Sequence, residues 1–117
     1  MVLGRLPFAL RLALYAVAAG VLLYLCLAPS KDLPSVNIWD KAEHAIAWAV
    51  LAGSGLVLFP RHPARIVVFA LAFGALVEVL QGNLPFGRDM DWTDWAADAV
   101  GVAASLALYA LVRQARR

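Results

Sequence analysis

Residues 78–101 have the sequence EVLQGNLPFGRDMDWTDWAADAVG, and this stretch decides how the rest of the chain is interpreted. Glu78 and Gln81 stand at the end of one apolar segment, and Asp94 and Asp98 stand at the start of the next. A turn containing Pro and Gly lies between the two segments. Because residues three or four apart share one face of an α-helix, each segment presents a polar face. The two polar faces predict a site where the segments meet.

The composition predicts an integral membrane protein. The chain has 117 residues, of which 63% are apolar and only 15% are charged. A soluble domain of this size does not carry so much apolar material. The length suits one domain over residues 1–117. Cys26 is the only cysteine, so no internal disulfide can form. The composition therefore favours a single polytopic membrane domain.

Turn signals divide the chain into four apolar segments. Pro7 suits a helix start, and Asp-Lys-Ala-Glu at 40–43 has the pattern of a capping box. PRHPAR at 60–65 predicts a tight basic turn. A cleaved signal peptide is the alternative for the first segment, but the uncharged run 12–28 is long for one. We therefore predict an all-α bundle of four transmembrane helices at about residues 7–28, 40–59, 64–82 and 92–112.

Segment length places ionisable residues inside the membrane. The uncharged run 66–77 has 12 residues, which as a helix cover about 18 Å of a hydrocarbon core about 30 Å thick. This segment must therefore continue through Glu78 to cross the membrane. By the same arithmetic, the last segment must include Asp98 and the second must include His44 to be long enough to cross the membrane. Three segments then carry ionisable groups about one helical turn inside the same membrane face.

The charged residues predict the orientation. Cytoplasmic loops carry an excess of Lys and Arg. One side of the predicted membrane has seven basic residues: Arg5, Arg11, Arg61, Arg65, Arg113, Arg116 and Arg117. The other side has three, together with all eight acidic residues. We therefore expect both termini in the cytoplasm (N-in/C-in) and the polar cluster at the extracytoplasmic face. The net charge of +2 reflects topology, and nucleic acid is not an expected partner.

Some polar residues have structural interpretations beside functional ones. Asp40 and Asp91 suit helix N-caps, and Asp94 fits the same pattern. Lys41 suits a side chain that extends along the helix to the membrane interface. Gly101 belongs to a stripe of small residues that permits close helix packing. We assign structural roles to Asp40, Asp91 and Gly101.

Glu78 and Asp98 have no such explanation. A charged side chain inside a span costs on the order of 2.5–3.5 kcal/mol unless it is paired, and intramembrane acids mark functional sites. Arg88 is the expected counter-ion, and it could equally hold an anionic ligand. His44 suits proton transfer or ligand binding, with a packed, hydrogen-bonded core histidine as the alternative.

Four motifs occur in order along the last three segments: Asp40-Lys41-x-x-His44, Glu78-x-x-Gln81, Pro85-x-Gly87-Arg88, and Asp94 followed by Gly101. This ordered set resembles the VanZ-like family of small polytopic bacterial membrane proteins. The chain departs from the family at Asp98, where Asn is common, and this change suggests a proton shared between Asp94 and Asp98. The resemblance implies a multi-pass protein of the bacterial cytoplasmic (inner) membrane and resistance to the glycopeptide antibiotic teicoplanin.

The first functional hypothesis is an enzyme that acts on an envelope lipid or a lipid-linked cell-wall precursor by hydrolysis or group transfer. The acid–base candidates are His44, Glu78 and Asp94. The substrate-binding candidates are Lys41, Gln81, Arg88 and Asp98. A divalent metal is compatible with His44, Glu78, Asp94 and Asp98, since oxygen-rich sets suit hard cations. The spacing matches no specific metal motif, so the cofactor stays unknown.

The second hypothesis is a protein without enzymatic activity. Its polar cluster would bind lipid head groups or would hold the bundle together as a structural network. A proton-coupled carrier ranks last, because the polar residues lie at one membrane face and no segment shows the signature of a broken helix. The oligomeric state is not readable from the sequence.

Overall fold

The protein is an all-α bundle, as the sequence predicts. The computed structural model describes residues 5–27, 40–83 and 92–115. The helices are α1 (Phe8–Leu27), α2 (Asp40–Leu58), α3 (Pro63–Asn83) and α4 (Trp92–Ala115). Each predicted segment coincides with one helix, and the bounds differ by three residues at most. The turn signals in the sequence therefore mark the true helix ends.

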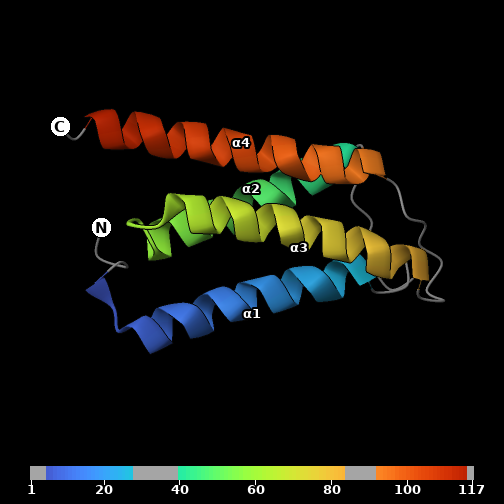
Figure 1. Ribbon diagram of the computed structural model, residues 1–117, viewed down its shortest axis with the longest axis horizontal. Coiled ribbons are helices and arrows are strands. Elements are labelled where there is room, and N and C mark those ends of the chain that lie inside the picture. The colour runs from blue at the N-terminus through green and yellow to red at the C-terminus, as the bar shows by residue number, and fades with distance from the viewer. Residues whose placement is uncertain (1–4, 28–39, 84–91, 116–117) are drawn as a thin grey trace.

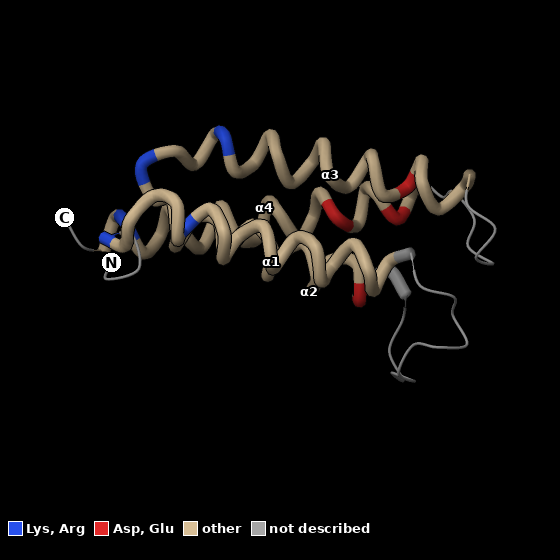
Figure 2. Tube along the Cα trace, turned by 90° about the horizontal axis from the view of Figure 1, so that it is seen from below, with Lys and Arg blue, Asp and Glu red and all other residues tan. Residues whose placement is uncertain are grey.

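The four helices run along the length of an elongated bundle measuring 47 × 27 × 24 Å (Figure 1). The start of α1, the connection from α2 to α3 and the end of α4 lie at one end of the bundle. Figure 2 shows the described Lys and Arg residues towards that end and the described Asp and Glu residues towards the other. The described residues thus have the charge separation that the sequence predicts.

The outer surface is apolar over most of its length. Three helices of the described chain are long and apolar enough to cross a membrane: Phe8–Cys26, Pro63–Asn83 and Trp92–Ala115. The apolar part of α2 is shorter, Ala42–Leu58. Large apolar side chains such as Val17 on α1 are exposed to the surroundings. Extended exposed apolar surface is what a bundle needs in contact with lipid. The chain is therefore a helical membrane protein.

Helices α2 and α4 make the most extensive contact in the bundle. At their crossing, a Cβ atom on Gly101 would lie 2.1 Å from the carbonyl oxygen of Ala45 and 2.8 Å from the backbone nitrogen of Ala49. No side chain fits there. One turn further on, Ser105 Oγ donates a hydrogen bond to the Ala49 carbonyl. Gly101 has the close-packing role that the stripe of small residues predicts.

Two tryptophans attach α3 to its neighbours. Trp48 Nε1 of α2 donates to the Ala70 carbonyl at 2.9 Å, and Trp95 Nε1 of α4 donates to the Leu71 carbonyl at 2.9 Å. Both indoles approach α3 beside Gly74, where a Cβ would lie 3.1 Å from each of them. The missing side chain at Gly74 therefore lets α2 and α4 reach the backbone of α3.

A tight turn joins α2 to α3, as predicted from PRHPAR. His62 N donates to the Phe59 carbonyl at 3.1 Å. Pro63 is the first residue of α3, where a missing N–H costs nothing. Tyr109 Oη of α4 donates to the Pro60 carbonyl at 2.6 Å. This bond fixes the turn against the last part of α4.

Helix α1 is the least enclosed helix and is attached near both ends. Arg11 Nη1 donates to the Leu58 carbonyl at 2.9 Å, which satisfies a carbonyl at the end of α2. Gln81 Nε2 of α3 donates to the Cys26 carbonyl at 2.8 Å. Between these points the buried ring of Tyr15 packs edge-on against Phe59 and tilted against Phe69. A cavity lies beside this part of α1.

Candidate functional site

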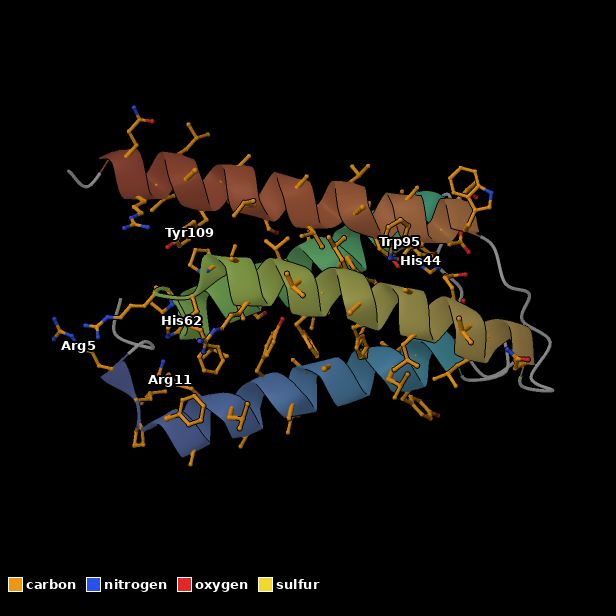
Figure 3. All side chains as sticks on the ribbon, in the orientation of Figure 1. Arg5, Arg11, His44, His62, Trp95 and Tyr109 are labelled. Atoms are coloured by element: carbon orange, nitrogen blue, oxygen red, sulfur yellow. The ribbon has the colours of Figure 1, made fainter. Side chains whose placement is uncertain are left out.

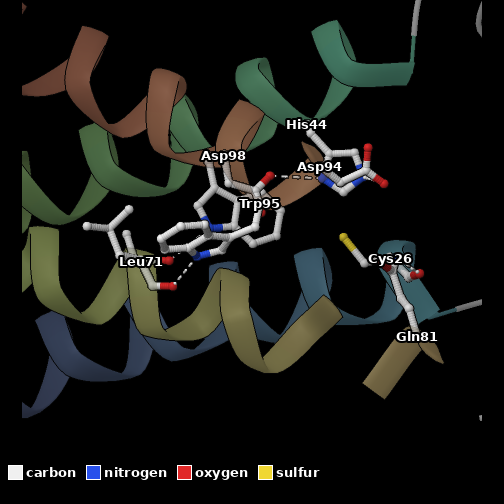
Figure 4. A network of polar contacts seen from close by, with 9 residues as sticks. Cys26, His44, Leu71, Gln81, Asp94, Trp95 and Asp98 are labelled. Carbon is white, nitrogen blue, oxygen red and sulfur yellow. Dashed lines mark hydrogen bonds and ion pairs between the residues drawn. The ribbon is translucent and has the colours of Figure 1, made fainter. Parts of the chain in front are cut away.

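The centre of the candidate site is a buried pair formed by His44 of α2 and Asp98 of α4. His44 Nδ1 and Asp98 Oδ1 are 2.9 Å apart (Figure 4). When Asp98 is ionised, its carboxylate can only accept a hydrogen bond, and Nδ1 then carries the shared proton. In a neutral ring the other nitrogen, Nε2, is then an acceptor. Asp98 thereby selects the ring form in which Nε2 can take a proton or bind a cation.

Asp94 lies on the Nε2 side of this pair, and Glu78 belongs to the same cluster. Asp94 Oδ2 is 3.7 Å from His44 Nε2, a distance that suits an ion pair and is too long for a direct hydrogen bond. One ring nitrogen of His44 and one carboxylate oxygen each of Glu78 and Asp94 lie within 4.8 Å of one another. All three side chains are buried, with Glu78 only 4% exposed. Three helices thus bring one imidazole and two further carboxyl groups to one point.

The local sequence explains how these side chains meet. Asp94 and Asp98 are four residues apart on α4 and therefore lie one turn apart on the same face. His44 is held in orientation by Trp48, four residues on, with ring centroids 5.9 Å apart and planes at 19°. A Cβ on Gly74 would lie 2.9 Å from Asp98 Oδ2, so this glycine makes room for the carboxyl group. The pair is consequently fixed from three sides.

The cluster has the composition of a site for a divalent cation. His44, Glu78 and Asp94 offer one nitrogen and two oxygens, a mixed set that zinc and manganese accept. A histidine that ligates a metal usually donates its other N–H to a carboxylate, which orients the ring. Asp98 stands in that position towards Nδ1. Of the four residues in the predicted metal set, His44, Glu78 and Asp94 are grouped closely enough to be ligands, and Asp98 is placed to support the histidine.

Asp98 is 0% exposed and contacts His44 through Oδ1, so the structure gives it a supporting contact, and its predicted role in substrate binding stays a prediction. The suggestion that Asp94 and Asp98 share a proton with each other changes. The two acids face different nitrogens of the same imidazole, which therefore lies between them. Asp98 acts on the site through the ring of His44.

The remaining predicted site residues separate into two groups. Gln81 is buried and uses its amide nitrogen to bind the Cys26 carbonyl, so it connects α3 to the end of α1. The structure therefore gives Gln81 a bracing contact, and its predicted role in substrate binding stays a prediction. The second group lies outside the described residues. It consists of Arg88 and Asp91, and of the side chains of Asp40 and Lys41, the first two residues of α2.

Two residues that support the site carry no motif of their own in the sequence. Trp48 stacks on His44 and anchors α3 through its indole nitrogen. Gly74 provides the space beside Asp98. The available signal was positional: Trp48 follows His44 by one turn, and Gly74 precedes Glu78 by one turn. A tryptophan and a glycine at such positions are common in membrane helices, so the pattern alone could not separate them from ordinary packing residues.

No protein-family model, curated protein or solved structure matches this chain. The fold and the site themselves define a class: a small helical membrane bundle with a buried histidine–carboxylate cluster near one end.

Proposed function

We propose that this chain is a VanZ-like protein of the bacterial cytoplasmic membrane whose site carries out acid–base chemistry on the head group of an envelope lipid or lipid-linked cell-wall precursor. The observation that carries the proposal is the buried His44–Asp98 pair with Nε2 directed towards Asp94. The excess of basic residues at the opposite end of the bundle supports an extracytoplasmic site.

Each residue then has a defined step in a hydrolysis or group transfer. Asp98 holds the Nδ1 proton and stabilises the imidazolium that forms when Nε2 accepts a proton from water or from a substrate hydroxyl. Asp94 or Glu78 is the partner acid that returns a proton to the leaving group. Arg88 and Lys41 remain the proposed contacts for an anionic head group. Such a division of labour requires two titratable groups whose environments differ.

A bound divalent cation is an alternative use of the same residues, because a metal on Nε2 of His44 would prevent that atom from accepting a proton. Held by His44, Glu78 and Asp94, it would supply a Lewis acid and lower the pKa of a bound water. The metal-dependent version of the proposal predicts that activity disappears with a chelator and returns with a specific metal. The metal-free version predicts that chelation has no effect.

The test uses the full chain in liposomes that contain a lipid-linked cell-wall precursor, with release of the head group followed by chromatography. His44→Gln should lower turnover by about 10²–10⁴-fold, the range for loss of an acid–base group. Glu43→Gln is the matched control, because Glu43 is the neighbouring acid on α2 and is not part of the cluster. Its turnover should stay within about twofold of the unchanged protein. Full turnover in folded His44→Gln would exclude the acid–base role.

A head-group receptor without turnover is the alternative function, and the burial of the cluster favours it over a fully open active site. In that case the unchanged protein releases no head group, and Glu78→Gln lowers precursor binding. The implied link to teicoplanin is tested by expressing the chain in a susceptible bacterium. Resistance that His44→Gln removes and Glu43→Gln retains would connect the cluster with that phenotype.

A further inference from the structure

A second candidate binding site lies at the opposite end of the bundle from the His44 cluster. It is a cavity of about 920 Å³ between the first half of α1, the α2–α3 turn and the start of α3. Its volume falls in the range of small-molecule pockets, about 300–1,000 Å³. Figure 3 labels Arg5, Arg11 and His62, which line it, at this end of the molecule. The cavity contains none of the residues assigned to the proposed function.

The cavity is lined by cations without matching anions. Arg5, Arg11, Arg61 and Arg65 contribute to its walls, and the described residues that line it include no Asp or Glu. Arg11 is already held in place: its Nε and Nη1 atoms donate to backbone carbonyls, and its guanidinium lies 5.2 Å from the ring centre of Phe59. Two of the five N–H groups of Arg11 are used in this way. A fixed guanidinium beside three exposed ones is an arrangement that binds phosphate.

A buried hydroxyl group lies on the apolar side of the cavity. Tyr15 is 6% exposed, lines the cavity, and its Oη has no hydrogen-bond partner among the described residues. The ring is seated over Gly55, where a Cβ would lie 2.9 Å from the ring carbon that bears the hydroxyl. The Oη atom is itself buried, so the ring of Tyr15, and not its hydroxyl, forms this part of the cavity wall.

The walls become apolar with distance from the end of the bundle. Phe8 and Ala19 of α1 both line the cavity, and the part of the helix between them is about 16 Å long. Leu12 and Ala16 line it as well and are exposed at the outer surface of α1, where lipid is expected. A charged end and a long apolar side that reaches the lipid-facing surface match a molecule with a phosphate head and a hydrocarbon chain. A free phosphate ester would leave the apolar part of the cavity unfilled.

We propose that this cavity, defined by Arg11, Arg61, Arg65 and Tyr15, binds an anionic phospholipid through its phosphate group. The guanidinium groups hold the phosphate, the ring of Tyr15 packs against the glycerol region, and the first part of the lipid's hydrocarbon chain lies along α1. Lipid bound here joins α1, the least enclosed helix, to the α2–α3 turn.

The test measures lipid binding by native mass spectrometry on the full chain in phosphatidylcholine nanodiscs. Phosphatidic acid, diacylglycerol and glycerol 3-phosphate are added in separate titrations. Phosphatidic acid should bind at least tenfold more tightly than the other two. Arg65→Gln should weaken its binding about tenfold. Arg113→Gln is the matched control, since Arg113 is an exposed arginine in the last turn of α4 and does not line the cavity. The affinity of the Arg113→Gln variant for phosphatidic acid should change by less than twofold.

Tyr15→Phe supplies a second measurement that does not depend on net charge. It should leave the melting temperature unchanged or raised, because the hydroxyl has no partner among the described residues, and it should leave the affinity for phosphatidic acid within about twofold, because the buried Oη atom does not reach the lipid. Equal losses in Arg65→Gln and Arg113→Gln would show general surface attraction and overturn the proposal. If glycerol 3-phosphate binds as tightly as the lipid, the apolar wall contributes nothing and the lipid assignment fails.

Discussion

A double-mutant cycle on His44 and Asp98 tests the geometry at the centre of the candidate site. The cycle compares His44→Ala, Asp98→Ala and the double variant with the unchanged protein. The coupling energy that the cycle measures depends on how completely the pair is buried, since exposed ion pairs contribute almost nothing to stability. Asp98 is 0% exposed, and its Oδ1 atom is 2.9 Å from His44 Nδ1. We therefore expect a large coupling energy.

The expected magnitude follows from what each single change leaves behind. His44→Ala removes the partner of Oδ1, while Oδ2 has no hydrogen-bond partner among the described residues. An uncompensated buried charge costs about 3–5 kcal/mol. Asp98→Ala leaves the N–H of His44 buried, which costs about 1–3 kcal/mol. The double variant removes both groups and should lose about 2 kcal/mol less than the sum of the single losses.

The assay is reversible unfolding in mixed detergent micelles, followed by circular dichroism. A parallel cycle with Glu43→Ala in place of Asp98→Ala is the control, because adjacent residues on a helix do not face each other. Its coupling energy should stay below about 0.5 kcal/mol. If the His44–Asp98 coupling energy is equally small, Asp98 does not hold the ring of His44, and the tautomer assigned to His44 is wrong.

Two further substitutions test the packing around the site by thermal unfolding. Gly101→Ala should destabilise the fold by about 3 kcal/mol, because its Cβ would lie 2.1 Å from the Ala45 carbonyl oxygen. Gly20→Ala is its control: nothing lies within 4 Å of that Cβ, so the change should be neutral or stabilising by up to about 1 kcal/mol, and an equal loss in both variants would refute the steric argument. Trp48→Phe removes the hydrogen bond to the Ala70 carbonyl and should cost about 1–2 kcal/mol. An unchanged melting temperature would show that this bond does not hold α3.

The helices were predictable because their ends are marked by residues with few alternatives. Pro63, within the PRHPAR segment that predicts the turn, is the first residue of α3. The segment-length argument extended the third and fourth helices through Glu78 and Asp98, and both residues lie inside helices. Composition indicated a membrane protein, since 63% apolar residues is more than a soluble domain of this length carries.

The site was predictable as a set of residues but not as a set of contacts. Helical periodicity gave the polar faces of α3 and α4, and the structure brings Glu78, Asp94 and Asp98 together with His44. Periodicity gives no information about helix rotation or crossing distance, so it could not distinguish the acid behind the ring from the acids in front of it. The roles of Asp94 and Asp98 therefore depend on the three-dimensional arrangement of the helices.

The arginine-lined cavity was not predictable at all. Its walls come from α1, from the α2–α3 turn and from α3, and no short spacing joins them. Arg11 gave only a topological signal in the sequence, because basic residues are expected at a cytoplasmic end. Its hydrogen bond to the Leu58 carbonyl, 47 residues away, depends on how α1 docks. Tyr15 gave no signal, since a lone tyrosine in an apolar helix is ordinary.

Packing and chemistry in this protein depend on the same contact between α2 and α4. Ala45, which touches Gly101, is the residue after His44, and Gly101 follows Asp98 by three positions. A Cβ at Gly101 would force the two backbones apart by about 1 Å to reach ordinary contact distance. The same movement would stretch the 2.9 Å bond between His44 and Asp98 beyond hydrogen-bonding distance. Gly101→Ala should therefore lose the coupling energy of the His44–Asp98 pair together with its own packing energy, whereas Trp48→Phe, which acts on α3, should leave that coupling energy largely intact.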